Sequence, residues 1–296
     1  MIYIKIKSDF IKVFTGKGFY LCILLTIVLC FSANIYTDMI KNDQYSAFSA
    51  LRKFDRAFMI TDTSFCAFNV IHRAASGWLT MFIPIISAFA YIPLVCDEYE
   101  AKSIRFEIFR TGKKSYHISR FITACFCGGI AVTIGYAIFS IISFFVFPNI
   151  NEYNISQRDI FFDIMSCNYP DIQNGFIQPM FKILGSVFIY GAAAAAPSIT
   201  LTAIIRNKYL VICIPFFLKY AIGQTCLKLQ SQAIIDYEHI DDRILRLSSI
   251  INPDSLVYLQ QMGRDKKGVL IYNCVLVLIA FAFYLIIQLR RTDCGE

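Results

Sequence analysis

Charge is scarce in this chain, and that scarcity excludes an ordinary water-soluble domain. Only 17% of its 296 residues are charged, whereas 57% are hydrophobic and 16% aromatic. Soluble domains carry about 25% charged residues. The mean hydropathy of +0.56 points the same way. The composition therefore indicates a membrane protein in contact with lipid, and nucleic acid is not expected among its partners.

The motifs of nucleotide hydrolysis and of common intramembrane chemistry are also missing. The segment Thr111–Ser115 carries Gly-Lys-Lys-Ser but lacks the earlier glycine of a phosphate-binding loop. No His-Glu-x-x-His pattern occurs, and His72, His117 and His239 all fall between apolar runs. We therefore expect no enzyme and no bound cofactor. Serine–lysine chemistry, with Lys219 as the lysine, stays open as an alternative.

Six apolar runs are long enough to cross the roughly 30 Å hydrocarbon layer as helices. None contains Asp or Glu, which disfavours ion-coupled transport through buried carboxylates. Coupling through backbone carbonyls stays open. The sequence thus predicts an all-α polytopic membrane protein with a single transmembrane domain over 1–296 and spans at 19–36, 78–95, 121–147, 181–205, 209–229 and 269–289.

The distribution of Lys and Arg predicts the orientation of these spans. With the N-terminus inside, the inner segments hold 14 basic residues in 53 positions and the outer segments 11 in 113. Basic residues concentrate in cytoplasmic loops. We therefore expect both termini in the cytoplasm. The first run lacks a small-residue cleavage site and is expected to be retained as a span.

Residues 1–18 are predicted to form an amphipathic helix in the inner membrane interface. Tyr3, Phe10 and Phe14 recur at helical spacing, while Lys5 and Asp9 take the opposite face. Such a pattern suits a helix that lies along a bilayer surface.

The segment 96–120 is a charged cytoplasmic loop between the second and third spans. It combines alternating charges with apolar residues at 104, 106, 108 and 109, and Gly112 is expected to end a first short helix. Exposed apolar side chains among charges are typical of a docking surface. A solvated connector, basic only for topology, is the competing interpretation.

This loop resembles the first cytoplasmic loop of ABC-2 type transporter permeases. Members carry a Glu-Tyr-Glu-Asn-Gly-Thr-Ile-Arg-like stretch, which Glu98-Tyr99-Glu100 and Ile104-Arg105 match, with Ser103 in the place of Thr. Gly112, Tyr116, Ser119 and Arg120 fit the later part. Ala101 and Lys102 depart from the common Asn-Gly.

The resemblance implies the permease subunit of an ATP-driven exporter in a bacterial cytoplasmic membrane. Such permeases pair with a second copy or a sister permease, and ABC ATPase subunits that bind ATP and Mg dock on a coupling helix. Contact with the ATPase would be made by Glu98, Glu100, Arg105, Phe106, Phe109 and Arg110. The expected cargo is amphipathic or hydrophobic, with peptides first and drugs or lipid-like molecules next. A membrane sensor or accessory subunit is the alternative.

Two polar residues inside the predicted spans are candidates for the transport pathway. Lys219 lies near the middle of the fifth run, and ionisable groups at that depth usually serve a function. It is expected either to meet an acidic or phosphate group or to face water where the helix breaks near Gly223. Asn34, near the end of the first run, is the second candidate, unless it only satisfies a neighbouring helix.

Other features predict packing and loop structure. Gly191 to Ala196 give the fourth span a face of small residues, which favours close helix packing. Cys66 and Cys167 both fall in outer loops and are a possible disulfide. The last outer loop, 230–268, is expected to form short helices that cap an exit.

Overall fold

The computed structural model describes residues 2–38, 42–101, 103–205, 207–235, 242–261 and 265–290, and most of them are helical. The first half of the chain comprises α1 (Ile2–Thr15), α2 (Lys17–Phe31), β1 (Asn34–Asp38), β2 (Asp43–Ser46), α3 (Ala47–Lys53), α4 (Arg56–Met59), η1 (Thr63–Phe65), α5 (Ala67–Ser76), α6 (Trp78–Phe89), α7 (Ile92–Glu100), α8 (Ile104–Thr111) and α9 (Lys113–Val146). The second half comprises η2 (Ile150–Glu152), α10 (Ile155–Ser166), η3 (Pro170–Asn174), α11 (Ile177–Leu201), α12 (Lys208–Ile235), α13 (Asp242–Ile251), η4 (Pro253–Leu256) and α14 (Lys266–Arg290).

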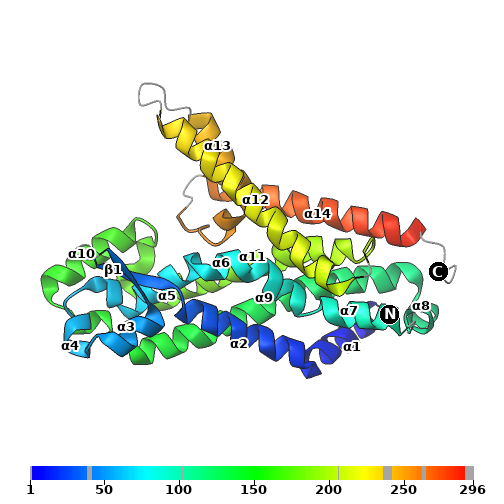
Figure 1. Cartoon of the computed structure of the whole chain (residues 1–296), viewed down its shortest axis with the longest axis horizontal. Helices are drawn as coiled ribbons and strands as arrows, with labels where there is room; N and C mark the ends of the chain where they lie inside the picture. The colour runs from blue at the N-terminus through cyan, green and yellow to red at the C-terminus, as the bar shows by residue number, and fades with distance from the viewer. Residues whose placement is uncertain are drawn as a thin grey trace.

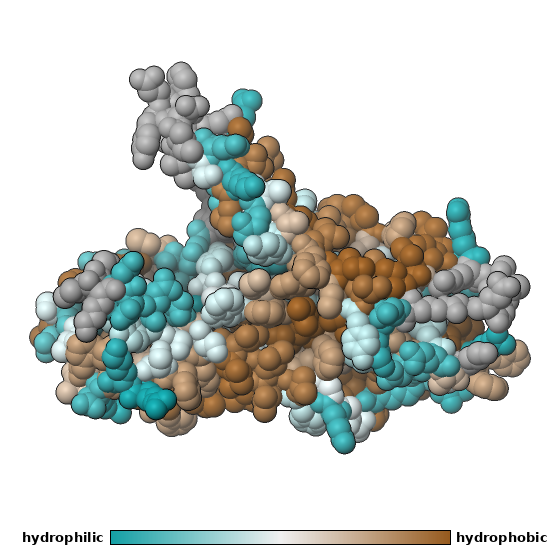
Figure 2. Space-filling model, viewed as in Figure 1, coloured by the Kyte–Doolittle hydropathy of each residue, from teal (hydrophilic) through white to brown (hydrophobic). Residues whose placement is uncertain are grey.

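Five helical segments of the described chain are long and apolar enough to cross a membrane. They are Trp78–Glu100, Lys113–Glu152, Ile177–Leu201, Lys208–Gln232 and Lys266–Arg290. A sixth crossing results if α1 and α2, which meet at a bend of 63°, count as one span. Hydrophobic residues gather over the middle of the molecule and along α14, and hydrophilic residues gather at its two ends (Figure 2). The chain is therefore a helical, multi-pass membrane protein.

The long helices place different short elements at the two ends of the molecule (Figure 1). We call one the α8 end, since it carries α8 together with the start of α1 and the last turns of α14. The other is the hairpin end, which carries β1, β2, α3, α4 and α10. The start of α1 and the end of α14 thus lie at the same end of the molecule, whereas the assignment of both termini to the cytoplasm stays a prediction.

The first predicted span is shorter than the sequence suggested. Its helix ends at Phe31, and Asn34–Asp38 form a strand that pairs antiparallel with β2. The prediction of helix over 32–36 is therefore wrong, and the fold contains a small hairpin beside its helices. The hairpin is stabilised by an aromatic cluster in which the Tyr36 ring centroid lies 4.8 Å from that of Phe65 and 6.2 Å from that of Tyr45. Such ring pairs add to the stabilisation from burial alone.

The second predicted span is interrupted, and the third is extended. A break at Ala90 and Tyr91 separates α6 from α7, where Pro93 occupies the first turn of the new helix. Proline is tolerated there because the first-turn amide has no partner within the helix. The helix α9 already begins at Lys113. Most of the predicted loop 96–120 is thus helical, with α8 as a separate short helix between two long ones.

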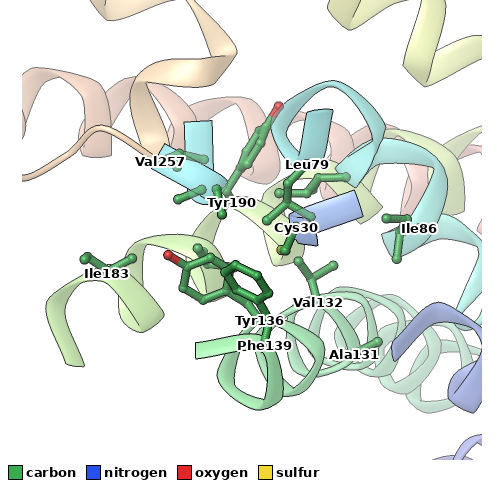
Figure 3. Packing of buried hydrophobic residues seen from close by; sticks show 14 of the residues in the cluster. Cys30, Leu79, Ile86, Ala131, Val132, Tyr136, Phe139, Ile183, Tyr190 and Val257 are labelled. Carbon is green, nitrogen blue, oxygen red and sulfur yellow. The ribbon is translucent and has the colours of Figure 1, made fainter. Parts of the chain in front are cut away.

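Glycines permit the close packing of α9 against α2 and α11. A Cβ at Gly191 would lie 3.1 Å from Gly129 Cα, and a Cβ at Gly135 would lie 2.6 Å from Thr26 Cβ. The close approach predicted for the small-residue face of the fourth span is confirmed. Around these contacts lies a buried core that includes Val132, Tyr136 and Phe139 (Figure 3).

Replacing Gly135 with Ala is expected to destabilise the protein. The new methyl group would overlap Thr26 and the carbonyl of Ile23 at 2.8 Å, so α2 must shift away from α9. Overpacking of this kind costs about 1 to 3 kcal/mol. Thermal unfolding in detergent measures the effect. Gly185→Ala is the matched control because nothing lies within 4 Å of its added Cβ; an equal loss in both variants contradicts the packing account.

Candidate functional site

The helix α8 ends where its sequence predicts. It follows Ser103 and ends at Gly112, whose φ of 81° lies in the left-handed region. Glycine adopts that conformation without the steric cost that a side chain imposes. The Gly112 amide donates to the carbonyl of Ile108 at 2.8 Å and closes the last turn. The chain then enters α9 directly, so α8 is held at the end of the longest helix.

The outward face of α8 carries large apolar side chains that no other described residue covers. Phe106 is 82% exposed and Phe109 is 95% exposed. Arg105 and Arg110 are exposed beside them. Exposed aromatic and arginine side chains on one short helix are the types that contribute most to protein interfaces. The structure thus places four of the predicted contact residues on one free face.

The inward face of α8 is tied to α1 through Glu107. Its carboxylate accepts hydrogen bonds from Lys5 and, at 2.7 Å, from Lys12. Lys5 also lies 2.8 Å from Asp9 on the next turn of α1. Lys5 and Asp9 are 3% and 0% exposed, so the charged face of α1 is turned into the protein. The apolar side chains of α1, such as Tyr3 and Ile11, are exposed instead.

Glu98 ties the same charges to α7 and α9. Its carboxylate accepts from Lys12 at 2.9 Å and contacts the guanidinium of Arg120. Arg120 is 1% exposed, lies over the Tyr116 ring with its Cζ 4.6 Å from the ring centroid, and is 3.8 Å from Glu107.

We call this set the ion cluster. It comprises three cationic and three anionic residues: Lys5, Lys12, Arg120, Asp9, Glu98 and Glu107. Moving a charge out of water costs several kcal/mol unless opposite charges and hydrogen bonds compensate it. Each member has at least one opposite partner. The cluster therefore holds α1, α7, α8 and α9 in one arrangement, because displacing any of these helices leaves a charge unpaired.

Beside the ion cluster, polar contacts connect α7 and α9 to α12 and α14. Tyr284 of α14 lies 3.4 Å from His117 of α9, and Gln288 of α14 donates to Tyr99 of α7 at 2.9 Å. Lys208, at the start of α12, reaches Asp97 of α7 at 3.3 Å. The helices α7 and α9, which carry Glu98 and Arg120 of the ion cluster, are thus in polar contact with the two long C-terminal helices.

The pKa of Glu107 reflects its two lysine partners. Burial acts to raise this pKa, but the hydrogen bonds and positive charges of Lys12 and Lys5 outweigh burial and hold it below the ordinary value of 4.5. The carboxylate therefore stays ionised at neutral pH, as its pairing role requires.

The expected exposure of Phe106 and Phe109 is confirmed, but Ile104, expected among the exposed apolar side chains of this loop, is buried. Glu100, like the arginine and phenylalanine pairs, is exposed, but Glu98 faces inward and belongs to the ion cluster. The sequence did not predict the ion cluster, to which Lys5, Asp9, Lys12, Glu107 and Arg120 contribute. The sequence signal that could have pointed to them is the pair of opposite charges, Lys5 and Asp9, one helical turn apart.

The two pathway candidates have different outcomes. Asn34 lies on β1, where its amide donates to Gln44 at 2.7 Å and is exposed, so its placement in a span was wrong. Lys219 lies in α12 and pairs with Asp254 at 2.8 Å. The alternative of a helix break near Gly223 was also wrong, because α12 continues to Ile235.

Cys66 and Cys167 are both free, and the possible disulfide is not formed. Cys66 is buried at the start of α5, and burial raises its pKa to about 11. Cys167 is exposed at the end of α10, where its Sγ lies 3.6 Å from the carbonyl of Asp163.

Comparison with known proteins adds no assignment to this geometry. No protein-family model matches the chain, and no curated protein matches it. Among the described residues, no three His, Cys, Asp or Glu side chains are grouped so as to hold a metal ion. The functional argument therefore rests on the sequence pattern of the loop and on the arrangement of α8.

Replacing Glu107 with Gln is expected to destabilise the protein by about 2 kcal/mol. The substitution removes a charged acceptor from buried Lys5, and hydrogen bonds to charged groups contribute roughly 1.5 to 3 kcal/mol. Thermal unfolding in detergent measures it. The control is Glu100→Gln, an exposed site nearby, where a change within about 0.5 kcal/mol is expected. Equal losses of stability in the two variants would show that the contacts of Glu107 contribute no more to folding than those of an exposed glutamate.

The same pair of proteins predicts a pH dependence. A carboxylate with a depressed folded-state pKa contributes stability above its ordinary pKa and loses that contribution as pH falls through the folded-state value. The difference in unfolding temperature between wild type and Glu107→Gln should therefore be constant above about pH 5 and shrink below the ordinary value of 4.5. A difference that is unchanged at pH 3 contradicts the pairing of Glu107 with Lys5 and Lys12.

Proposed function

We propose that this chain is the permease subunit of an ATP-driven exporter of the ABC-2 type. The observation that carries the proposal is α8, a short helix with two exposed phenylalanines whose other face is fixed to α1, α7 and α9 by the ion cluster. A helix mounted in this way presents a rigid apolar surface and passes any force on it to the long helices. Those are the properties that a coupling helix needs.

The partner in this proposal is a separate ATPase subunit that binds ATP and Mg. The chain carries no phosphate-binding loop of its own. The α8 end would then face the cytoplasm of a bacterial cell, in agreement with its excess of basic residues. Phe106 and Phe109 would enter a pocket on the ATPase, while Arg105, Arg110 and Glu100 at its rim would fix the orientation.

Transport would follow from movement of the long helices relative to a second permease. When two ATPase subunits close on ATP, they would move the two docked α8 helices. The ion cluster would transmit that movement to α1, α7 and α9, and the bonds of Tyr284 and Lys208 to α14 and α12. The bundle would thereby alternate between inward-open and outward-open states. The proposed cargo is an amphipathic or hydrophobic molecule, a peptide first among them.

Removing the docking side chains should release the ATPase. The test is a mild-detergent pull-down of tagged chain with Arg105→Ala, Phe106→Ala and Phe109→Ala combined. Loss of one interface hot spot costs at least 2 kcal/mol, so retention should fall by about 30-fold or more. The measurement is the amount of co-purified protein identified as an ATPase with a Gly-x-x-x-x-Gly-Lys motif.

The matched control alters exposed apolar residues at the hairpin end. Ile160 and Ile164 of α10 are 57% and 59% exposed, and alanine there should leave ATPase retention unchanged. Retention by the α8 variant would contradict the docking face. Absence of any ATPase from the wild-type preparation would contradict the exporter and favour a sensor or accessory subunit.

A further inference from the structure

Residues 252–261, which we call the strap, connect α13 toward α14 and fold back onto the long helices. Leu256 and Leu259 are buried, as is Ser255. The strap's first turn, η4, contacts α11, α12 and α14. Val257 belongs to the same buried cluster as Tyr190 of α11 and Leu79 of α6 (Figure 3). The strap is thus packed into the bundle and does not lie loose on its surface.

Polar contacts fix the strap to three helices. Asp254 Oδ1 lies 2.8 Å from Lys219 Nζ of α12 and 3.3 Å from the hydroxyl of Tyr190. Tyr258 donates to the carbonyl of Ser76 at 3.3 Å, and Gln261 lies 3.0 Å from His72, both on α5. Only the first of these contacts is an ion pair.

Lys219 is a cation at an unusual depth. It follows Lys208 by 11 residues, or about 16 Å of helix, inside a segment apolar enough to span a membrane. Its side chain is 12% exposed. A charge at such a depth is unfavourable unless it is paired. Asp254 therefore supplies the anion that Lys219 requires in this arrangement.

We propose that Lys219 and Tyr190 form a binding site for the anionic group of an amphipathic molecule, a carboxylate or a phosphate, and that Asp254 occupies this site in the arrangement seen here. The proposal deepens the proposed function, on which it rests for the entry and exit of cargo. It specifies a carboxylate or a phosphate as the headgroup that binds in the transport path.

The geometry fits an exchange of one anion for another. The Lys219 ammonium and the Tyr190 hydroxyl, from different helices, converge on a single carboxylate oxygen, and the one proton of that hydroxyl is shared with the carbonyl of Thr80 at 3.2 Å. Charged and polar donors that converge in this way are how proteins hold carboxylates and phosphates. Apolar side chains lie one turn before Lys219, because Phe216 of α12 stacks on Phe82 of α6 with ring centroids 5.8 Å apart. A molecule with an anionic head and an apolar tail matches both halves of this surface.

Binding of an anion to Lys219 is linked to movement of the strap, because Asp254 of the strap and the anion compete for the same charge. If the strap lifts alone, Lys219 is left unpaired at depth, which opposes lifting. If an anion takes the place of Asp254, Lys219 remains paired and Asp254 is released toward water. An anionic amphiphile should therefore favour the lifted strap, and by reciprocity a lifted strap should favour the amphiphile.

The strap's position is measured by the labelling rate of a cysteine introduced at Ser255, which is 2% exposed. The full chain in nanodiscs carries Ser255→Cys, with Cys167, Cys213, Cys274 and Cys294 replaced by Ser, and is treated with a water-soluble maleimide. Asp254→Asn and Lys219→Met should each raise the rate about tenfold. The exchanged pair Asp254→Lys with Lys219→Asp should restore a slow rate, which separates loss of the ion pair from misfolding.

The anion is tested with three probes at equal concentration: dodecanoate, dodecyl phosphate and uncharged dodecanol. Both anions should speed labelling of the otherwise unaltered reporter several-fold, dodecanol should not, and Lys219→Met should abolish the response. Nanodiscs of phosphatidylcholine with and without phosphatidylglycerol separate the sources. A response to the anionic lipid alone assigns the site to a lipid headgroup, and a response in pure phosphatidylcholine assigns it to a free amphiphile.

Two results would overturn the site: equal responses to dodecanoate and dodecanol, or a response that survives Lys219→Met. The labelling needs no ATPase, so it fails independently of the proposed function. An anion response without ATPase co-purification would retain the site and remove the exporter. Co-purification without an anion response would retain the exporter and remove the site.

Discussion

The arrangement of this protein depends on six charges at one end of its bundle, of which Lys5, Asp9 and Arg120 are buried. Lys5, Lys12 and Arg120 face Asp9, Glu98 and Glu107 across four helices, and the numbers of positive and negative groups are equal. Apolar packing alone discriminates weakly among helix positions in a membrane, because lipid tails are as apolar as the side chains themselves. Opposite charges in a medium of low dielectric impose a definite arrangement instead, since each misplacement leaves a charge unpaired.

The helix α12 links this end of the molecule to the strap. Lys208 at its start reaches Asp97 beside the ion cluster, and Lys219 further along reaches Asp254 of the strap. α12 and the strap turn η4 are also in contact, and α12 extends away from the body of the molecule (Figure 1). In the proposed exporter, movement of α8 and movement of the strap would both act on α12. That layout connects the α8 end to the strap through the ion pairs of Lys208 with Asp97 and of Lys219 with Asp254.

A feature of this protein could be predicted from the sequence where local interactions determine it. The long apolar segments, the end of α8 at Gly112 and the exposure of Phe106 and Phe109 depend on hydropathy and on one glycine, and these predictions are confirmed. The pairing of Lys5 with Glu107 joins residues 102 positions apart, and no local sequence pattern predicts it. For the same reason Glu98 was assigned to the exposed face. The strand at Asn34 was missed because its stability comes from rings on several later elements.

The central claim is that α8 is a docking helix for an ATPase, and site-specific crosslinking in intact membranes tests it most directly. A photoreactive phenylalanine analogue replaces Phe109 and, as the matched control, exposed Phe48 at the hairpin end. Our account predicts that position 109, but not position 48, forms an adduct that peptide sequencing identifies as an ATPase with a phosphate-binding loop. Adducts from position 109 that contain only lipid, or the same proteins as those from position 48, would contradict it.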